Sequence, residues 1–534
     1  KMCGMLILLA AIGLTCSLTA QYFSAKAAVG FGTALRNDLF RHINSLSYRE
    51  IDTIGTSTLI TRMTSDINQV QSGVNLVLRL FLRSPFIVFG AMIMAFQVNV
   101  RAALIFVVAI PLLSIVVFGI LLISMPLYKK VQKQLDRVLL TTRENLLGAR
   151  VVRAFNRQQD EMKKFDEENS LLVNSQVFVG KISALMNPVT YVIVNGATII
   201  LIWTGAWQVE GGIITQGAVV ALVNYMSQIL VELVKLANLI ITISKSLACA
   251  NRISAVFEET SSIEDKADAA VLAANAGDAQ EQPAKVEFAS MDFAYAGSSE
   301  NALSQISFQA MRGQTIGIIG GTGSGKSTLV NLIPRFYDAT GGRVLVDGVN
   351  VKDMPLQALR EKIGIVPQKA VLFKGTLRDN IRWGKPDATD EEIYHALEIA
   401  QARDFVDSKD EGLDLMIQQG GKNLSGGQKQ RLTIARALVR NPEILVLDDS
   451  ASALDFATDA ALRKAIRENT KDMTVFLVSQ RATTIKNADQ ILVLDDGNLV
   501  GRGTHKELLD TCEVYREICF SQLSEKEVRE HAEA

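Results

Sequence analysis

The distribution of apolar residues divides the chain into two halves of different character. Up to about residue 257, long runs of Leu, Ile, Val, Ala and Phe dominate, whereas the remainder alternates short apolar strands with polar, helix-like segments. A membrane-spanning helix needs about 20 mostly apolar residues. Five stretches meet that requirement: residues 5–23, 76–98, 102–122, 182–207 and 216–243. The pattern therefore predicts an all-helical membrane domain followed by a soluble α/β domain.

The basic residues predict how the spans are oriented. The two long connections, 24–75 and 123–181, are rich in Lys and Arg, and positively charged connections stay on the cytoplasmic side. The two short connections then lie outside, where Trp203 and Trp207 suit the outer interface of the membrane. This topology places Lys1 outside and everything after residue 257 in the cytoplasm.

The first span, residues 5–23, bears on how much of the protein precedes it. Because the chain opens on an apolar run without an initiator Met, we expect a further span before it, which brings the full protein to six. The alternative, a secretory signal, is disfavoured because no small-residue cleavage site is clear.

The long cytoplasmic connections have the pattern of helices that continue out of the membrane. We expect each to turn at its far end, near residues 54–58 and 144–149, where it is well placed to contact a domain below the membrane. Three charged residues, Arg79, Arg83 and Glu232, fall within or beside the apolar spans. They either face a protein or water-filled interior, because a charge in lipid is costly, or snorkel toward the cytoplasmic interface.

Composition narrows the range of partners. The chain has 534 residues, 48% of them hydrophobic, and a formal net charge of -1. This balance gives no reason to expect a nucleic-acid partner. The five cysteines show no paired spacing and no nearby His, so we expect reduced, buried thiols. Residues 258–284 are rich in Ala, Asp, Glu, Ser and Gln, which indicates a linker because they cannot build a core.

A glycine-rich loop in the second half carries the clearest chemistry. An apolar strand at 316–319 leads into it, and an apolar helix pattern follows. The loop and the start of the helix comprise Gly320, Gly321, Thr322, Gly323, Ser324, Gly325, Lys326, Ser327 and Thr328. Gly-x-x-x-x-Gly-Lys-Ser in this context predicts a phosphate-binding loop, in which Lys326 reaches the outer phosphates and the Ser327 hydroxyl meets Mg²⁺.

A second apolar strand, 444–448, supports this interpretation. It ends at Asp448, a carboxylate suited to hold Mg²⁺ through water. The loop and the strand together predict a P-loop NTPase core with a nucleotide and Mg²⁺ as ligands. Kinases and small GTPases share that much.

A glycine-bearing turn before a predicted helix at 431–439 selects among these classes. Its residues are Ser425, Gly426, Gly427 and Gln428. The turn resembles the signature motif of the ATP-binding cassette (ABC) transporter ATPase, and the membrane half, with stretches such as 144–155, resembles the exporter type. The resemblance covers the whole chain. It implies an exporter-type transmembrane domain at 1–255, a linker at 256–285, an ABC nucleotide-binding domain at 286–525 and a charged tail at 526–534.

The resemblance also implies roles for further residues and an assembly. Tyr295 would stack on adenine, Gln368 would contact Mg²⁺ and water, and Asp455 would belong to the D-loop. Tyr295 could instead be a strand aromatic, and Gln368 a turn residue. Two ATPase domains would pack head to tail, with each ATP between the phosphate loop of one and the signature motif of the other. One chain alone would then have no complete site.

Two positions depart from the family at the chemistry itself. Asp449 stands where the family has a Glu that polarises the attacking water, and Gln480 stands where it usually has a His that contacts the γ-phosphate. Asp is one methylene shorter than Glu, and a displacement of about 1 Å can cost about 100-fold in rate. Gln cannot carry the charge of an imidazole. Gln419 also stands where exporters often have a Glu.

These departures, beside an intact signature motif, resemble the asymmetric heterodimeric exporters of bacteria, often multidrug exporters. We expect a plasma-membrane exporter half that binds ATP at a slow site and completes the competent site of a second half-transporter subunit. Its cargo is expected to be small and amphipathic or lipophilic. Asn195, Asn224, Met226 and Gln228 could meet such a cargo, but helix packing is the favoured interpretation for each.

Other classes compete with this interpretation. An ATP-gated channel or regulatory subunit is compatible with weak catalysis, and flux against a gradient would separate it from a pump. A homodimeric exporter would pair two weakened sites. A soluble ABC ATPase acting on ribosomes or DNA is excluded by the five spans, and an importer is disfavoured because importers usually keep the two parts on separate chains.

Overall fold

The computed structural model describes residues 2–265, 283–450, 452–470 and 472–522. The chain divides into two compact units, Lys1–Asn44 with Thr56–Glu259, and Ser45–Gly55 with Thr260–Ala534. Most of the predicted linker, residues 266–282, and the whole predicted tail at 526–534 lie outside the described residues.

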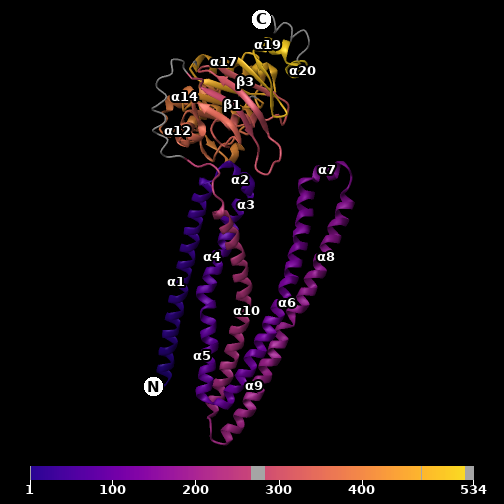
Figure 1. Ribbon diagram of the computed structural model, residues 1–534. Helices are drawn as coiled ribbons and strands as arrows, with labels where there is room; N and C mark the ends of the chain where they lie inside the picture. The colour runs from indigo at the N-terminus through magenta and orange to yellow at the C-terminus, as the bar shows by residue number, and fades with distance from the viewer. Residues whose placement is uncertain (1, 266–282, 451, 471, 523–534) are drawn as a thin grey trace. The chain divides into compact units, whose positions relative to one another are not determined.

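The first unit is helical (Figure 1). Its α-helices are α1 (Met2–Ser45), α3 (Thr56–Thr61), α4 (Ile67–Leu76), α5 (Arg83–Val98), α6 (Val100–Leu147), α7 (Ala149–Ala154), α8 (Gln158–Ala184), α9 (Met186–Glu210) and α10 (Gln216–Glu258). Two π-helical turns, η1 (Arg62–Asp66) and η2 (Val77–Phe81), interrupt the segment from α3 to α5. Among the described residues, five helical stretches are long and apolar enough to cross a membrane, which confirms the predicted number of spans.

The core of the helical unit lies where α5, α6, α9 and α10 meet. Phe106, Leu113, Leu201 and Met226 are fully or almost fully buried there. In contrast, α1 leaves most of its side chains exposed, including Cys3 and Cys16. The expectation that all five cysteines are buried is therefore wrong for these two. An apolar span can expose such residues because lipid, unlike water, does not drive them inward.

The helices continue well past the apolar stretches, as predicted, but one turn lies further along than expected. Helix α6 runs to Leu147 and packs along α8, and the chain between them breaks at Gly148 and again at residues 155–157. Asn156 adopts φ 55°, a left-handed conformation that Asn tolerates better than most residues. The short α7 fills the space between the breaks, so the tip extends to residue 157 rather than ending at 149.

A buried carboxylate lies between two of the spans. The Glu232 side chain of α10 is 5% exposed, accepts a hydrogen bond from Ser84 Oγ of α5 at 2.8 Å and pairs with Lys235 Nζ at 2.9 Å. Of the two interpretations left open for this residue, the structure favours the protein interior. Arg83 is exposed and Arg79 half-buried, so the three charged residues do not share one environment.

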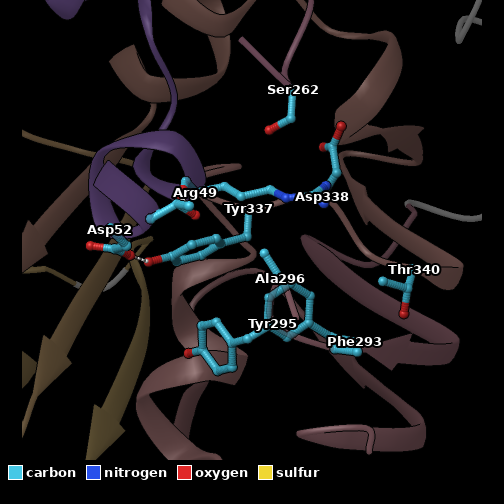
Figure 2. A pocket seen from close by; sticks show the side chains of 11 residues that line it. Arg49, Asp52, Ser262, Phe293, Tyr295, Ala296, Tyr337, Asp338 and Thr340 are labelled. Atoms are coloured by element: carbon cyan, nitrogen blue, oxygen red, sulfur yellow. Dashed lines mark hydrogen bonds between the residues drawn. The ribbon is translucent and has the colours of Figure 1, made fainter. Parts of the chain in front are cut away.

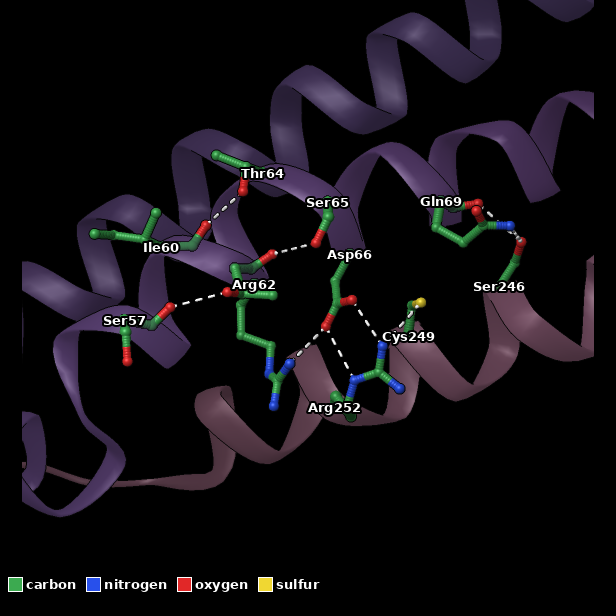
Figure 3. Close-up of polar contacts among 11 residues, drawn as sticks. Ser57, Ile60, Arg62, Thr64, Ser65, Asp66, Gln69, Ser246, Cys249 and Arg252 are labelled. Carbon is green, nitrogen blue, oxygen red and sulfur yellow. Dashed lines mark hydrogen bonds and ion pairs between the residues drawn. The ribbon is translucent and has the colours of Figure 1, made fainter. Parts of the chain in front are cut away.

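A second ion-pair cluster joins η1 to α10 (Figure 3). Asp66 accepts two hydrogen bonds from the Arg252 guanidinium, at 2.7 and 3.0 Å, and one from Arg62 at 2.9 Å. The Asp66 carboxylate is 6% exposed, so removal of Arg252 would leave a largely buried charge with one partner fewer. The cluster therefore fixes the π-helical turn against α10.

The second unit is an α/β domain with α2 (Tyr48–Ile54) packed against it. Its strands are β1 (Val286–Phe293), β2 (Leu303–Ala310), β3 (Thr315–Gly320), β4 (Gly341–Val346), β5 (Val349–Asn350), β6 (Ile363–Val366), β7 (Gly375–Thr376), β8 (Met416–Ile417), β9 (Ile444–Asp448), β10 (Thr474–Val478), β11 (Gln490–Asp495) and β12 (Asn498–Gly503).

The helices of this unit surround the sheet. They are α11 (Lys326–Asn331), α12 (Leu356–Glu361), α13 (Leu377–Arg382), α14 (Asp390–Ile399), α15 (Arg403–Asp407), α16 (Gly426–Leu438), α17 (Phe456–Asn469), α18 (Ala482–Ile485), α19 (His505–Thr511) and α20 (Glu513–Gln522), with 3-10 turns η4 (Val351–Asp353), η5 (Gly412–Asp414) and η6 (Gln419–Gly421).

Ten of the described strands form one sheet, in the order β5-β4-β1-β2-β12-β11-β3-β10-β9-β6. The centre, β11-β3-β10-β9-β6, is parallel, whereas β5, β4, β1 and β2 form an antiparallel edge. Strand β3 is buried on both faces, because Ile318 packs into one hydrophobic cluster and Ile319 into the other. This sandwiching explains the uninterrupted apolar runs of the central strands.

Candidate nucleotide site

Three parallel strands bring the predicted phosphate loop, Asp448 and Gln480 together. Strand β10 lies between β3 and β9, and Val478 is in register with both Ile318 and Asp448. The carboxyl ends of the three strands therefore meet at one edge of the sheet, where α/β folds place their ligands. The loops that follow these strands carry the predicted site residues.

Glycines in the loop are required by close contacts and by backbone conformation. A Cβ on Gly320 would lie 2.1 Å from the Leu494 carbonyl oxygen, and Gly325 has φ 91°. Both features exclude larger residues without strain. Helix α11 starts directly after Gly325, so its first N–H groups point into the loop.

Lys326 is held inside the loop that it closes. Its ammonium donates to the carbonyl oxygens of Gly320 at 3.0 Å and Gly321 at 2.5 Å, and the residue is 8% exposed. Burial lowers the pKa of Lys326, although the nearby Asp449 and Asp448 carboxylates partly oppose that shift. A desolvated cation at this position favours an anionic ligand.

Ser327 and Asp448 form the oxygen-rich part of the site. The Ser327 hydroxyl donates to Asp448 Oδ1 at 2.9 Å. Burial, reinforced by the neighbouring Asp449, raises the pKa of Asp448. Among the described residues no group of three or more His, Cys, Asp or Glu could hold a metal ion. The hydroxyl and carboxylate oxygens fit Mg²⁺ that arrives with phosphate oxygens and keeps several waters, rather than an all-protein cage.

Asp449 and Gln480, the two departures, both line this site. Asp449 is partly buried, adopts φ 44° and accepts a long hydrogen bond, 3.4 Å, from the Gln368 amide. Burial raises the pKa of Asp449. Gln480 is exposed at the rim. A positive φ is unusual for a non-glycine residue, and such residues are found most often at functional sites.

A cavity of about 450 Å³ collects most of the predicted residues. Its lining includes Tyr295, Thr322, Gly323, Gly325, Lys326, Ser327, Thr328, Gln368, Asp448, Asp449 and Gln480. Gly320, Gly321 and Ser324 belong to the loop but are not part of this lining, and neither are Ser425, Gly426, Gly427, Gln428 and Asp455.

The lining also contains residues that sequence analysis missed. They are Asn301, Ala302, Asp496 and Gly497, with Val478 at the end of β10. Asp496 and Gly497 form the tight turn between β11 and β12, and both have positive φ. An Asp-Gly pair between two apolar strands is a recognisable hairpin signal, but only the fold brings that turn to the phosphate loop.

Tyr295 lies between the nucleotide cavity and a second, smaller one. Its hydroxyl is 2.9 Å from Thr328 Oγ1 in α11, and the residue is 41% exposed. On its other side is a cavity of about 250 Å³, shown in Figure 2, lined by Arg49, Asp52 and Thr53 of α2 together with Ser262 and residues near Tyr337. An exposed aromatic ring beside the loop is suited to stack on a base.

Tyr337 joins α2 to the aromatic group around Tyr295. Its hydroxyl donates to Asp52 at 2.7 Å, and its ring lies 5.6 Å from that of Tyr295 in an edge-on arrangement. Tyr48 of α2 packs on Phe336 with ring centroids 4.7 Å apart. Burial, followed by the bond to Asp52, raises the pKa of Tyr337, so its hydroxyl remains a donor over the physiological range.

The predicted signature turn is a separate structure on the same unit. Ser425 caps α16: its hydroxyl accepts from Gln428 N at 3.3 Å, and the Gln428 side chain accepts from Ser425 N at 2.9 Å. Ser425 and Gly426 are exposed, and a Cβ on Gly427 would approach the Ala453 carbonyl oxygen at 3.2 Å. Asp455 caps α17 without such reciprocity: its carboxylate accepts from Thr458 N and from the Thr458 hydroxyl, both at 2.9 Å. The helix begins five residues before the predicted 431 because this reciprocal cap offsets the two glycines.

Comparison with known families decides the identity of this arrangement. Residues 1–233 match the family described as the ABC transporter transmembrane region, and residues 303–452 match the family described as ABC transporter. An uncharacterized ABC transporter ATP-binding protein of Mycobacterium tuberculosis (strain ATCC 25618 / H37Rv) is 37% identical over 515 residues, 95% of this chain and 86% of the relative. The chain belongs to the ABC transporter family.

Other relatives of this ABC transporter carry more informative names. A putative multidrug export ATP-binding/permease protein of Bacillus subtilis (strain 168) is 34% identical over 93% of this chain and 85% of the relative. An ATP-dependent lipid A-core flippase of Desulfotalea psychrophila (strain LSv54 / DSM 12343) is 34% identical over 89% and 81%. The solved structure of a bacterial Atm1-family ABC exporter with ATP bound superposes with a TM-score of 0.75 at 26% identity, over 94% of this chain and 86% of that one.

These findings confirm the predicted fold class, the membrane localisation and the ATPase activity. The ABC transporter is a multi-pass membrane protein with a helical transmembrane domain fused to a cytoplasmic ATPase domain. It is an exporter half that binds ATP and couples ATP hydrolysis to transport of a substrate across the membrane. The roles of individual site residues remain predictions.

Proposed function

We propose that this chain is the catalytically weak half of a heterodimeric exporter, which binds Mg²⁺·ATP at a slow site and completes the competent site of its partner. One observation carries the proposal: Asp449 and Gln480 line the same cavity as Lys326, so both departures fall in one site. Asp449 is one methylene shorter than the Glu that polarises the attacking water, and Gln480 lacks the charge that an imidazole can carry.

The binding groups support retention of ATP at this slow site. Lys326 is buried and surrounded by loop carbonyls, and Ser327 and Asp448 hold the oxygen pair that suits Mg²⁺. These groups act on bound phosphate whether or not a water is activated. Affinity for Mg²⁺·ATP and the rate of its hydrolysis are thereby separated.

The signature turn supports the second part of the proposal. Ser425 and Gly426 are exposed, and neither is part of the lining of this chain's nucleotide cavity. The N-terminus of α16 presents N–H groups and positive potential to an anion supplied from outside the chain. A γ-phosphate held by the phosphate loop of a partner fits that requirement.

The membrane unit supports an amphipathic or lipophilic cargo. A mostly apolar cavity of about 620 Å³ between α9 and α10 includes Asn224 in its lining. Asn195, Asn224 and Gln228 are exposed, so packing within this chain, the favoured interpretation, holds only for the buried Met226. An apolar wall with a few amides suits molecules with both characters. The relatives named for multidrug export and for lipid A-core transport fit the same class.

The decisive experiment compares the purified chain without a partner with its repaired double variant. The wild-type chain should hydrolyse ATP very slowly, because the water-activating and γ-phosphate positions are both altered. Asp449→Glu combined with Gln480→His should raise that rate at least about tenfold when two copies of the chain pair, since each copy would supply its intact signature turn to the phosphate loop of the other. Asp449→Glu combined with Gln480→Ala is the matched control. Robust hydrolysis by the wild-type chain alone would contradict the heterodimer.

A further inference from the structure

We propose that Gln522, near the end of α20, positions the loop that carries Gln480 and thereby sets how strongly this site distinguishes ATP from ADP. The Gln522 side-chain nitrogen donates to the Gln480 carbonyl oxygen at 2.7 Å, and its side-chain oxygen accepts from Ala482 N at 2.9 Å. One amide thus spans the two backbone groups on either side of Arg481.

The C-terminal helix holds Gln522 in place through its buried face. Tyr515 and Cys519 are fully buried, and the spacing 515, 519, 522 puts the three side chains on one face of α20. The Tyr515 hydroxyl lies 2.6 Å from His505 Nδ1 of α19, and burial raises the pKa of the Cys519 thiol to about 11. Because both anchors are fixed in the core, the amide at the next turn has a defined position.

Helix α18, which follows this loop, is held by α17. Arg463 donates to the carbonyl oxygens of Thr483 at 3.2 Å and Thr484 at 3.1 Å, and it pairs with Asp459 at 3.1 Å. Helix α17 directly follows Asp455, whereas α20 contacts the loop at Gln480. Of the two supports, only the one from Gln522 acts at the residue that lines the nucleotide cavity.

The effect on nucleotide choice follows from where Gln480 lies. This step rests on the proposed function, in which Gln480 occupies the γ-phosphate position. ADP lacks that phosphate, so a displaced Gln480 should weaken binding of an ATP analogue and leave ADP unaffected. A general disturbance of the domain would weaken both nucleotides together.

The test measures affinities of the detergent-solubilised chain for ADP and for the non-hydrolysable analogue AMP-PNP, both with Mg²⁺. Gln522→Ala should lower the affinity for AMP-PNP by about three- to tenfold, the range for losing one or two hydrogen bonds, with ADP unchanged. Gln522→Glu keeps the acceptor for Ala482 N but turns a carboxylate oxygen toward the Gln480 carbonyl oxygen, so its loss should be at least as large as that of Gln522→Ala. Ser521→Ala is the control, because that hydroxyl bonds within α20, to Ile518 O.

A double variant completes the test. Once Gln480→Ala has removed the γ-phosphate contact, adding Gln522→Ala should change the AMP-PNP affinity no further. An unchanged AMP-PNP affinity in Gln522→Ala, an equal loss for both nucleotides, or an additive loss in the double variant would overturn the proposal. None of these outcomes depends on a partner, so a failed heterodimer would be recognised separately, by robust hydrolysis in the chain alone.

Discussion

The phosphate loop and the signature turn are both glycine-bearing helix starts in one unit, yet the first is enclosed and the second is exposed. The loop encloses Lys326 and faces Asp448 across a cavity, so its charges are balanced within the chain. The turn at Ser425 is exposed, and its reciprocal cap involves only the N–H groups of Ser425 and Gln428. A helix N-terminus becomes a binding site only when other elements complete it. Here the chain encloses the phosphate loop, and the proposed function leaves the signature turn to be completed by a second molecule.

The largest expected effect comes from placing a charge on the exposed turn. Gly426→Asp in the transporter assembled with its natural partner should reduce steady-state ATPase and transport at least 100-fold, because a carboxylate would repel the γ-phosphate held by the partner. Gly426→Ala adds only a Cβ at ordinary contact distance, 3.8 Å from that of Ala453, and should cost much less. Normal turnover in Gly426→Asp at equal assembly would contradict the assignment.

A smaller effect is expected from the enclosed loop. Lys326→Ala should weaken ATP binding at this chain's site by about 10- to 100-fold, since a buried cation loses its contact with the outer phosphates. If the competent site belongs to the partner, as proposed, hydrolysis in the assembled transporter should persist in part. Photolabelling of each subunit with an azido-ATP measures nucleotide binding at each site, and a steady-state ATPase assay measures hydrolysis by the whole assembly. Loss of all hydrolysis while the partner still bound ATP normally would contradict the assignment of an independent competent site to the partner.

The smallest effect is expected at Asp449. Asp449→Asn should lower turnover of the assembled transporter no more than about threefold, because the proposed function assigns this base to a slow site. The variant should also shift the pH dependence of Mg²⁺·ATP binding to this chain. Burial first, and then the Asp449 charge, raise the pKa of Asp448, and a protonated carboxyl cannot hold the cation.

The sign of that shift follows directly. Affinity for Mg²⁺·ATP should fall as the pH drops through the raised pKa of Asp448 and recover above it. Removing the neighbouring charge brings that pKa down, so the midpoint should move to lower pH in Asp449→Asn. Isothermal titration of the purified chain between about pH 4 and 7, the range above the ordinary Asp pKa, measures it. A midpoint that moves upward would argue against the electrostatic coupling.

Local sequence patterns predicted the residues that bind nucleotide better than the residues that pack around them and hold them in position. Gly320 to Ser327 could be recognised because each glycine and the lysine stand at fixed spacing after an apolar strand. The reciprocal cap of Ser425 and Gln428 was present in the sequence as Ser-x-x-Gln, but the two glycines obscured the helix start. The Asp-Gly pair at Asp496 signalled a hairpin, but neither Asp496 nor Gln522 gave a local signal that it lies beside the nucleotide site. Their places depend on which strands become neighbours and on how α20 packs, which are properties of the whole fold.

The spans showed the same contrast. Five apolar stretches predicted five helices, since hydrophobic length alone decides that number. The turns η1 and η2 were not predicted, because a π-helical turn depends on contacts such as the pair between Asp66 and Arg252 rather than on the apolar pattern.

The ion pair at Asp66 also bears on how force would travel along this chain. The polypeptide passes between the two units three times, after Asn44, after Gly55 and after Glu259. Close to these crossings, His42 Nε2 lies 2.9 Å from the Val256 carbonyl oxygen, and Asp66 is paired with Arg252. Helix α10 therefore bonds both to the end of α1, which leads into the first crossing, and to η1, which follows the second. A displacement of any one of the three connecting segments would be transmitted to the other two through these bonds. A conformational change in the ATPase domain would then move the connected membrane helices together.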